Sequence, residues 1–341
     1  MMRQIVSRSY SPSTHATVSN EAQSQICRTQ EVRSAGLRVI GYHYVRDLPR
    51  TRFPRIKGML LDSFRRQVQG LCQRYEMASL ESALEFLAGR FVPSRDLCLL
   101  TFDDGLKEHF SEVTPILEQR KIQGLFFLST VCIEEQQVVL VHKNHFLMAA
   151  LGFEEYQRAF LQLLEQRGVA GEECVKREQA CETYRFDTPE VAVFKYLLNF
   201  VLAPNLRSEL LNEMFPRYLG DEAAFARELY VSWDEARAMQ DAGMVIGGHS
   251  HQHVALATLS LQDQREDLLM STRLLHRHLA AQPSWPFCYP YGNPVDAFTA
   301  DTVALLQELR YCCAFTTCPG VNNAGEDVFR IRRIDTTEVG F

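Results

Sequence analysis

The sequence predicts an α/β protein with parallel strands, and three observations support this. Short apolar runs of strand length recur along the chain, and polar residues bound them. Segments with apolar residues at helical spacing lie between these runs, which is the alternation of a parallel sheet covered by helices. The chain has 341 residues, of which 46% are hydrophobic, enough for one large or two ordinary domains.

The predicted elements follow one another in a regular order. Seven apolar runs are predicted strands, at residues 37–43, 97–102, 124–129, 244–248, 287–291, 312–316 and 328–334. Four segments between them have helical spacing, at residues 64–75, 113–119, 261–279 and 299–309. The first of these places Phe64, Val68 and Leu71 on one face. Right-handed crossovers would lay such helices over the outside of a sheet or barrel.

Two segments depart from this alternation. Residues from about 134 to 229 contain no convincing strand, only charged and apolar residues at helical spacing, and we interpret them as a helical insertion. This insertion is either a lid beside the functional site or a peripheral buttress. Residues 1–36 are polar and rich in serine, threonine and arginine, and we expect a disordered tail there.

Composition excludes several classes of protein. The 36 basic and 42 acidic residues give a formal net charge of −6, whereas nucleic-acid-binding proteins carry clustered basic excess, so we expect no nucleic-acid partner. No apolar run approaches the length of about 18 residues that predicts a membrane-spanning helix. The N-terminus lacks the apolar stretch of a secretory signal, and the ten cysteines form no Cys-x-x-Cys pair. We therefore expect a cytoplasmic protein with reduced thiols.

Two adjacent carboxylates follow one of the predicted strands. Asp103 and Asp104 come directly after the apolar run 97–102 and precede Gly105. Like charges so close repel each other at the end of a buried strand, so such a pair is expected where a cation binds or where one member acts as a base. Gly105 permits a sharp turn that directs both side chains to the mouth of the fold. The structural alternative is a turn in which Asp104 caps the next helix.

Two histidines follow another predicted strand. His249 and His253 are four residues apart after the run 244–248, and on a helical turn their imidazoles would lie side by side. Together with one of the two aspartates they form a set of one carboxylate and two imidazoles. Three ligands leave positions for water and substrate, as in catalytic zinc sites, and the second carboxylate can accept a proton from water.

These residues resemble the motifs of a known family. Thr101-Phe-Asp-Asp-Gly105 and His249-Ser-x-x-His253 resemble the first two motifs of the polysaccharide deacetylases, carbohydrate esterase family 4 with the NodB-homology domain. Phe287-Cys-Tyr-Pro-Tyr-Gly292 is similar to the third motif in its Tyr-Pro-Tyr-Gly form, and Gly41-Tyr-His-Tyr44 to the start of several members. The resemblance implies a distorted (β/α)₇ barrel over residues 37–341 and the removal of N-acetyl or O-acetyl groups.

The resemblance also implies roles for individual residues. It makes Asp103 the general base, and Asp104, His249 and His253 the ligands of a divalent metal. The metal would be Zn²⁺, with Co²⁺, Ni²⁺ or Mn²⁺ as alternatives. The backbone N–H of Tyr291 would stabilise the charge that develops on the oxygen of the tetrahedral intermediate.

The sequence departs from the family pattern in two places. The family uses a late histidine as general acid, but no histidine follows His278. The third motif also lacks its usual leading arginine. We therefore expect Arg330 or Arg333 to pair with Asp103 in its place. Candidates for the missing acid are earlier histidines, namely His43, His142 and His145.

The sequence thus predicts a metal-dependent hydrolase that deacetylates an amino sugar or a related small or lipid-linked metabolite. Three alternatives remain. The same fold can hydrolyse another C–N bond, in a cyclic imide, an amide or an N-formyl group. The domain can bind carbohydrate without catalysis, which the missing late histidine favours. Two histidines and one carboxylate also occur in non-haem iron oxygenases, but these do not need a second adjacent aspartate.

Overall fold

The computed structural model describes residues 35–184 and 187–340 of the chain. The tail predicted at residues 1–36 lies outside the described residues except for its last two. The described residues contain an eight-stranded, fully parallel sheet. Its strands are β1 (Leu37–Tyr42), β4 (Glu76–Met77), β5 (Leu97–Phe102), β6 (Gly124–Leu128), β7 (Val245–Gly248), β8 (Pro286–Cys288), β9 (Cys313–Phe315) and β10 (Ile334–Asp335).

Seven of these strands follow one another in the order β10-β1-β5-β6-β7-β8-β9, and β4 pairs with β5 off this path. The register aligns Ile40 with Leu100 and Leu100 with Gly124. A separate pair is formed by β2 (Val45–Arg46) and β3 (Met59–Leu60). The carboxyl ends of the parallel strands therefore meet at one edge of the sheet, where ligand sites of such folds lie.

The two ends of this strand order are joined by an irregular segment. Ahead of β10, the Ile331 N–H donates to the Ala314 carbonyl at 3.0 Å, and the Ala314 N–H donates to the Val328 carbonyl at 2.9 Å. The predicted strand at 328–334 therefore pairs as a regular strand only from Ile334, because a turn in which the Arg330 N–H donates to the Asp327 carbonyl interrupts it. The predicted fold class, a distorted (β/α)₇ barrel with a helical insertion, is confirmed.

Side chains alternate between the two faces of the strands. Leu99 of β5 and Phe127 of β6 belong to a buried cluster that also contains Phe315 of β9, and the rings of Phe127 and Phe315 lie 5.4 Å apart. Contact between strands so distant in the order shows that this cluster fills the barrel interior. Ile40 and Phe126 point to the other face, where they join a cluster with residues of the surrounding helices.

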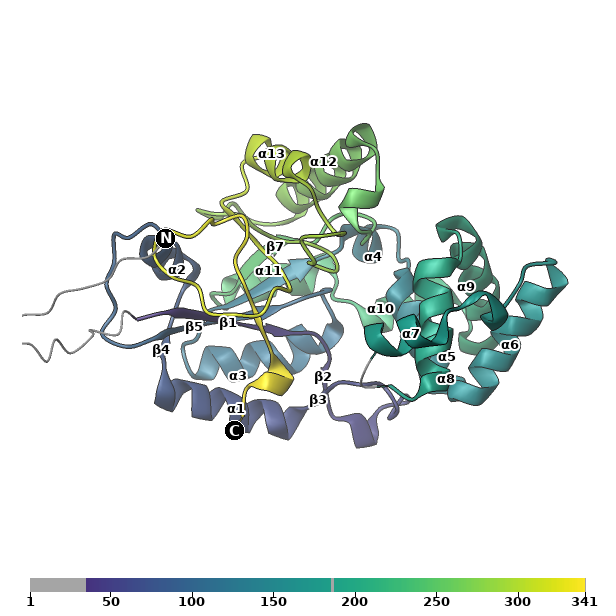
Figure 1. Cartoon of the computed structure of the whole chain (residues 1–341). Coiled ribbons are helices and arrows are strands. Elements are labelled where there is room, and N and C mark those ends of the chain that lie inside the picture. Colours follow the sequence, from purple (N-terminus) through teal and green to yellow (C-terminus); the bar gives the residue numbers. More distant parts are fainter. Residues whose placement is uncertain (1–34, 185–186, 341) are drawn as a thin grey trace, which may run out of the picture. The chain divides into compact units, whose positions relative to one another are not determined.

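Helices follow most of the strands, as Figure 1 shows. Those outside the insertion are α1 (Leu61–Arg74), α2 (Leu80–Leu87), α3 (Thr114–Gln119), α4 (Thr130–Glu134), α11 (Trp233–Asp241), α12 (Leu261–His278) and α13 (Ala300–Glu308). Short 3₁₀ or π turns are η1 (Leu48–Arg50), η2 (His109–Val113), η3 (Glu172–Cys174), η4 (Leu197–Val201), η5 (Leu256–Thr258) and η6 (Thr336–Glu338). No helix among the described residues is long and apolar enough to span a bilayer.

The chain between β6 and β7 carries a group of helices that Figure 1 shows together. These are α5 (Leu140–Leu151), α6 (Phe153–Gln166), α7 (Arg177–Thr183), α8 (Pro189–Tyr196), α9 (Pro204–Leu219) and α10 (Glu222–Leu229). Their core contains the buried rings of Phe146, Phe160 and Phe215, and the same cluster includes Tyr44 and Tyr230. Tyr44 follows β1, so the insertion packs directly beside the mouth of the barrel.

Candidate metal centre and active site

Asp103 and Asp104 lie at the carboxyl end of β5, and both are almost fully buried. Asp104 has a φ of 76° and Gly105 a φ of 62°, so the chain turns sharply in the left-handed region. A Cβ at Gly105 would lie 2.7 Å from a methyl of Leu128, so the turn also requires glycine for space. This turn lets both carboxylates face the mouth of the barrel, although neighbouring residues of a straight strand point to opposite faces.

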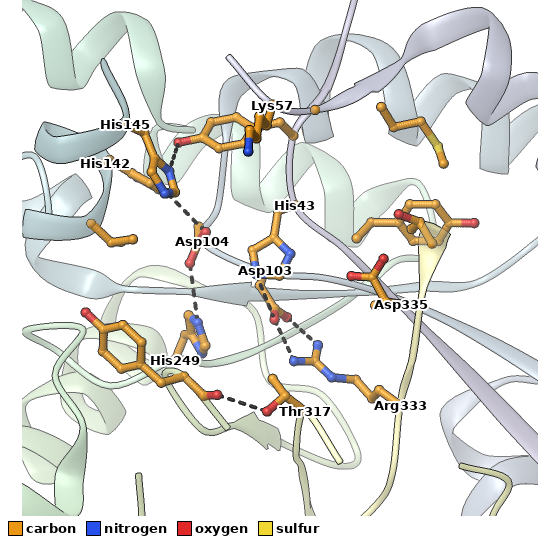
Figure 2. Close-up of a pocket in the computed structure, with 18 of the residues that line it drawn as sticks. His43, Lys57, Asp103, Asp104, His142, His145, His249, Thr317, Arg333 and Asp335 are labelled. Atoms are coloured by element: carbon orange, nitrogen blue, oxygen red, sulfur yellow. Dashed lines mark hydrogen bonds and ion pairs between the residues drawn. The ribbon is translucent and has the colours of Figure 1, made fainter. Parts of the chain in front are cut away.

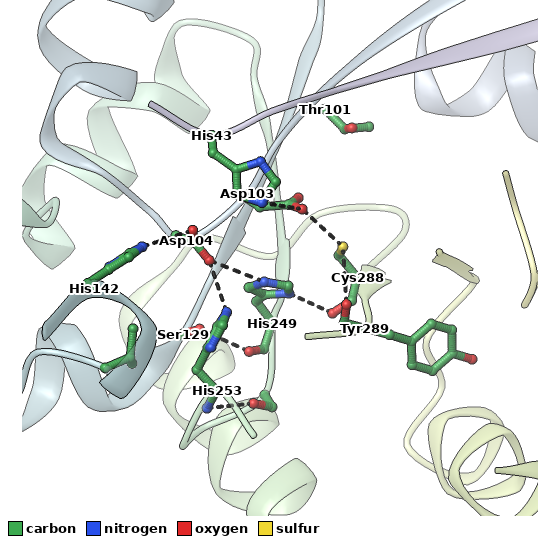
Figure 3. Close-up of polar contacts among 12 residues, drawn as sticks. His43, Thr101, Asp103, Asp104, Ser129, His142, His249, His253, Cys288 and Tyr289 are labelled. Carbon is green, nitrogen blue, oxygen red and sulfur yellow. Dashed lines mark hydrogen bonds and ion pairs between the residues drawn. The ribbon is translucent and has the colours of Figure 1, made fainter. Parts of the chain in front are cut away.

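One carboxylate oxygen faces two imidazoles. Asp104 Oδ1 lies 3.1 Å from His253 Nε2 and 3.4 Å from His249 Nε2 (Figure 3). On its other side, His249 Nδ1 lies 2.7 Å from the Cys288 carbonyl oxygen, which can only accept, so Nδ1 carries the proton. In the neutral ring this leaves the Nε2 lone pair free toward Asp104, as metal-binding histidines require.

The two histidines converge by a different route from the predicted one. The segment from His249 to His253 is not a helical turn, so that prediction is wrong. His249 still lies in line with β7, and positive φ angles of 61° at Ser250 and 52° at His253 fold the chain back. The His253 N–H donates to Ser250 Oγ at 2.9 Å, which closes the turn. His251 points away and contacts Thr130 Oγ1 at 2.9 Å.

The Asp104, His249 and His253 group fits a divalent metal. Their ligand atoms all lie within 4.8 Å of one another. Asp104 Oδ1 is buried and has no hydrogen-bond partner among the described residues, which a cation would supply. Burial alone would raise the pKa of Asp104, but the surrounding imidazoles hold it well below its usual value. An ionised oxygen with two imidazole nitrogens is a donor set of catalytic zinc sites.

A second group, Asp103 with His249 and Cys288, is equally close together. It fits a metal less well. Both oxygens of Asp103 already bind a guanidinium, and burial raises the pKa of the Cys288 thiol, which opposes the thiolate that a metal needs. Cys288 Sγ instead lies 3.6 Å from Asp103 Oδ2, within reach of a weak hydrogen bond.

Asp103 is paired with Arg333, as Figure 2 shows. Arg333 Nη1 lies 2.8 Å from Oδ1 and Nη2 lies 2.7 Å from Oδ2. Burial alone would raise the pKa of Asp103, but Arg333, followed by His43 and His249, lowers it to about 2. Arg330, the other candidate, is exposed and pairs with Asp327. Of the two arginines that the sequence offered as partners of Asp103, Arg333 is therefore the one that pairs with it.

The three histidines considered as acids occupy different positions. His43 is about half exposed, and its Nε2 lies 3.6 Å from Asp103 Oδ2. His142, on α5, is 1% exposed and has both ring nitrogens engaged, with Asp104 Oδ2 at 3.1 Å and Tyr230 Oη at 2.6 Å. His145 Nδ1 lies 3.4 Å from Tyr44 Oη, one turn further along α5.

Tyr291 lies on the other side of the centre. Its φ of 62° is in the left-handed region, and its ring contacts that of His253 with centroids 5.3 Å apart. Its carbonyl accepts from Thr317 Oγ1 at 3.0 Å. The side chain is 48% exposed. The ring of Tyr291 thus lies against His253, and its backbone is tied to Thr317.

These groups share one cavity of about 630 Å³. Its floor carries the two aspartates, His249, His253 and Arg333. Three other segments form its walls: Val141, His142 and His145 from α5, Lys57 to Met59 ahead of α1, and Asp335 to Thr337 near the C-terminus. The insertion therefore contributes side chains directly to the cavity.

Comparison with known proteins identifies the family. A profile described as polysaccharide deacetylase matches residues 92–314, which include both aspartates, both histidines and Tyr291. The chain belongs to the polysaccharide deacetylase family. It is accordingly a hydrolase that acts on carbon–nitrogen bonds. No curated protein matches the chain.

Solved structures share the fold of this deacetylase at low identity. IcaB from Ammonifex degensii is 20% identical with a TM-score of 0.55, over 89% of this chain and 92% of IcaB. The Streptococcus pyogenes deacetylase PplD, in complex with acetate, is 14% identical with a TM-score of 0.52, over 88% and 91%. A de-N-acetylase from Aggregatibacter actinomycetemcomitans is 15% identical with a TM-score of 0.50, over 90% and 97%.

Sequence reasoning missed several residues of the deacetylase site. His109 is fully buried, and its Nε2 lies 2.9 Å from the His43 carbonyl oxygen, which it holds in place. Burial lowers the pKa of His109 to about 4, so the ring is neutral and donates from Nε2. Tyr44 and Tyr230 flank His142, with ring centroids 5.5 Å and 5.6 Å away. The only signal for Tyr44 was its place beside His43 in the Gly-Tyr-His-Tyr segment.

Proposed function

We propose that this deacetylase removes an N-acetyl group from an amino sugar or a related metabolite. The observation that carries the proposal is the pair of carboxylates with separate partners. Asp104 faces His249 and His253, whereas Asp103 is ionised beside Arg333 and is left out of that group. A site that only binds carbohydrate has no need of this second, ionised carboxylate.

Asp104, His249 and His253 are the proposed ligands of a divalent metal, with Zn²⁺ first and Co²⁺, Ni²⁺ or Mn²⁺ as alternatives. A metal bound there would lower the pKa of a water molecule and polarise the acyl oxygen of the substrate. The Cys288 carbonyl orients His249 for this role.

Asp103 is the proposed general base. It lies in the same cavity as the proposed metal ligands and can accept a proton from the attacking water. Its pKa of about 2 keeps it ionised at every pH at which the protein would work. Arg333 fixes the plane of the carboxylate through two parallel contacts, which makes it a positioning residue.

His43 is the proposed general acid. Breaking the C–N bond releases an amine, and its nitrogen must take up a proton as acetate leaves. His43 lines the cavity, is half exposed and lies beside Asp103. His142 is buried with both nitrogens engaged, so it is poorly placed to reach a substrate. The backbone N–H of Tyr291, whose ring contacts that of His253, is proposed to donate to the oxygen that becomes negative in the intermediate.

The substrate is proposed to be small or to present one end to the cavity. A volume of about 630 Å³ is within the usual range of small-molecule sites, and α5 closes one side of it. An amino sugar, free or linked to a lipid outside the cavity, fits these limits. By name, the Aggregatibacter enzyme removes N-acetyl groups and PplD binds acetate, and we extend this chemistry to the present chain.

The test is acetate release from a panel of N-acetylated amino sugars, offered free and linked to lipid, with Zn²⁺ added. We expect release that a chelator abolishes, that added metal restores, and that Asp103→Asn removes. Asp62→Asn, an exposed aspartate on α1 that pairs with Arg65, is the matched control. Release of formate, or opening of a cyclic imide without acetate release, would favour the other C–N hydrolases. Binding of sugar with metal present and no turnover would favour a non-catalytic domain.

A further inference from the structure

His142 of the insertion contacts the proposed metal ligand Asp104, and Tyr230, at the end of the insertion, contacts His142. His142 lies near the start of α5, and Tyr230 lies directly after α10, 88 residues further along the chain. His142 Nε2 is 3.1 Å from Asp104 Oδ2, and His142 Nδ1 is 2.6 Å from Tyr230 Oη. Figures 2 and 3 show His142 pointing at Asp104 from the side opposite His249. His142 and Tyr230 are 1% and 2% exposed, so water does not compete for these contacts.

The carboxylate sets the direction of the first hydrogen bond in this chain, and the next direction follows for the neutral form of His142. An ionised carboxylate only accepts, so His142 donates to Asp104 from Nε2. A neutral imidazole then accepts at Nδ1, and the Tyr230 hydroxyl must donate to it. The Tyr230 oxygen in turn accepts from the Val139 N–H at 3.3 Å. The contacts therefore run in one direction, from the backbone of the insertion to the carboxylate.

We infer that His142 and Tyr230 are positioning residues that hold Asp104 in its metal-binding orientation, an inference that rests on the metal site of the proposed function. A carboxylate can rotate about its Cβ–Cγ bond. The contact from His142 occupies Oδ2 and leaves Oδ1 directed at His249 and His253. Such partners of metal ligands fix ligand geometry and raise metal affinity.

His142 acts through Asp104 and is not itself a ligand. Among the described residues, two groups of side chains are close enough to share an ion. One is Asp104, His249 and His253, and the other is Asp103, His249 and Cys288. Neither group contains His142. The rings of His142 and His253 are 6.4 Å apart. His142 contacts Oδ2 of Asp104, whereas the other two imidazoles face Oδ1.

Backbone contacts beside Tyr230 also tie the end of the insertion to the barrel. Leu106 pairs with Tyr230 in an isolated antiparallel bridge, and the Val231 N–H donates to the Gly105 carbonyl at 2.9 Å. The end of the insertion is thus hydrogen-bonded to the turn that carries Asp104, while its beginning supplies His142. Metal binding and docking of the insertion are coupled through this carboxylate.

The test measures metal affinity of the full chain by competition with a chromogenic chelator, without any substrate. We expect His142→Ala to weaken Zn²⁺ binding by about 10–100-fold, and Tyr230→Phe to weaken it by a smaller factor. His142→Gln, whose amide can still donate to Asp104, should recover part of the loss. Tyr156→Phe is the matched control, because its buried hydroxyl donates to Asn144 Oδ1 at 2.6 Å, away from Asp104. It should bind metal as the wild type does.

Two readouts separate this inference from others. X-ray absorption of the Co²⁺ form should count two imidazoles in the wild type and in His142→Ala; a fall from three to two would make His142 a ligand and overturn the positioning role. Wild-type affinity in His142→Ala and Tyr230→Phe would also overturn it. If His142→Ala does not fold, the metal affinities of His142→Gln and Tyr230→Phe test the positioning role in its place. Metal binding that depends on His142 in a chain without acetyl release would support the inference while the proposed function fails.

Discussion

Arg333 binds Asp103 through two parallel contacts, of 2.8 Å and 2.7 Å, between its terminal nitrogens and the carboxylate oxygens. Arg333 Nε also donates to the Thr316 carbonyl at 2.8 Å, so the guanidinium is fixed at both ends. Phe287 or Cys288 stands where the third motif of the family has its usual leading arginine. The guanidinium beside the proposed base therefore comes from the segment before β10.

Removing this guanidinium should move the pH dependence of hydrolysis. The pKa of Asp103 is lowered to about 2 because Arg333, together with His43 and His249, outweighs burial. Arg333→Gln removes the largest of these lowering contributions, so the pKa of Asp103 rises and the acidic limb of the pH–rate profile should shift to higher pH. Each unit by which the pKa exceeds the assay pH lowers the ionised fraction about tenfold. Arg330→Gln, which removes the exposed partner of Asp327, should leave the profile unchanged. An unaltered profile in Arg333→Gln would exclude this role.

Metal content should distinguish the three histidines of the loop after β7. His249→Ala and His253→Ala each remove one proposed ligand, and we expect both to lose Zn²⁺ on dialysis. His251→Ala is the control, because its ring faces Thr130 and Glu135. Elemental analysis after dialysis gives the metal content of each variant.

Thermal unfolding gives an independent measure of the same site. A metal that binds only the folded chain stabilises it by about 2.7 kcal/mol at a free concentration of 100 times its dissociation constant. Zn²⁺ should therefore raise the unfolding temperature of the wild type and of His251→Ala, but not of His249→Ala or His253→Ala. Full metal content in His253→Ala would contradict the proposed ligand set.

The barrel interior should dominate the stability of the metal-free chain. Phe127 is fully buried and contacts Phe315 across the barrel. Phe127→Ala removes a whole ring from this cluster, and such changes cost about 3–5 kcal/mol. Val92→Ala, at a side chain that is 89% exposed, should change the unfolding free energy by less than about 0.5 kcal/mol. Urea denaturation in chelator measures both, and a cost below about 1 kcal/mol for Phe127→Ala would show that the interior is loosely packed.

Much of the fold could be predicted because its strands are buried on both faces. The runs at β5 and β6 are continuous apolar segments, and the sequence locates them within a residue. The strand β4 is only two residues long and therefore carries no periodic signal. Helix α2 has eight residues and is recognisable mainly by its Ser79 cap. The predicted strand at 328–334 begins earlier than β10, because the turn at Asp327 that shortens the strand depends on contacts with β9.

The site was predictable where strands end and unpredictable where the insertion contributes. Asp103 follows β5 and His249 follows β7, with only β6 between these parallel strands, so their convergence at the carboxyl edge follows from topology. The choice between Arg330 and Arg333 required the path of the chain after Asp327. His142 is 38 residues from Asp104 in sequence, and no local pattern in α5 indicates that its ring faces the carboxylate.

His43 should matter most for substrates with poor leaving groups. It lies 3.6 Å from Asp103 Oδ2 and is held through its carbonyl by His109. If it protonates the departing nitrogen, His43→Ala should lower kcat for an N-acetyl amino sugar by about 10²–10⁴-fold. In an acetyl ester of a nitrophenol the nitrophenolate leaves as a stable anion without taking up a proton, so hydrolysis of this ester should fall far less. His145→Ala, on the opposite wall, should not discriminate between the two substrates. Equal losses on both substrates in His43→Ala, with metal content intact, would show that His43 acts on the geometry of Asp103 and not on the leaving group.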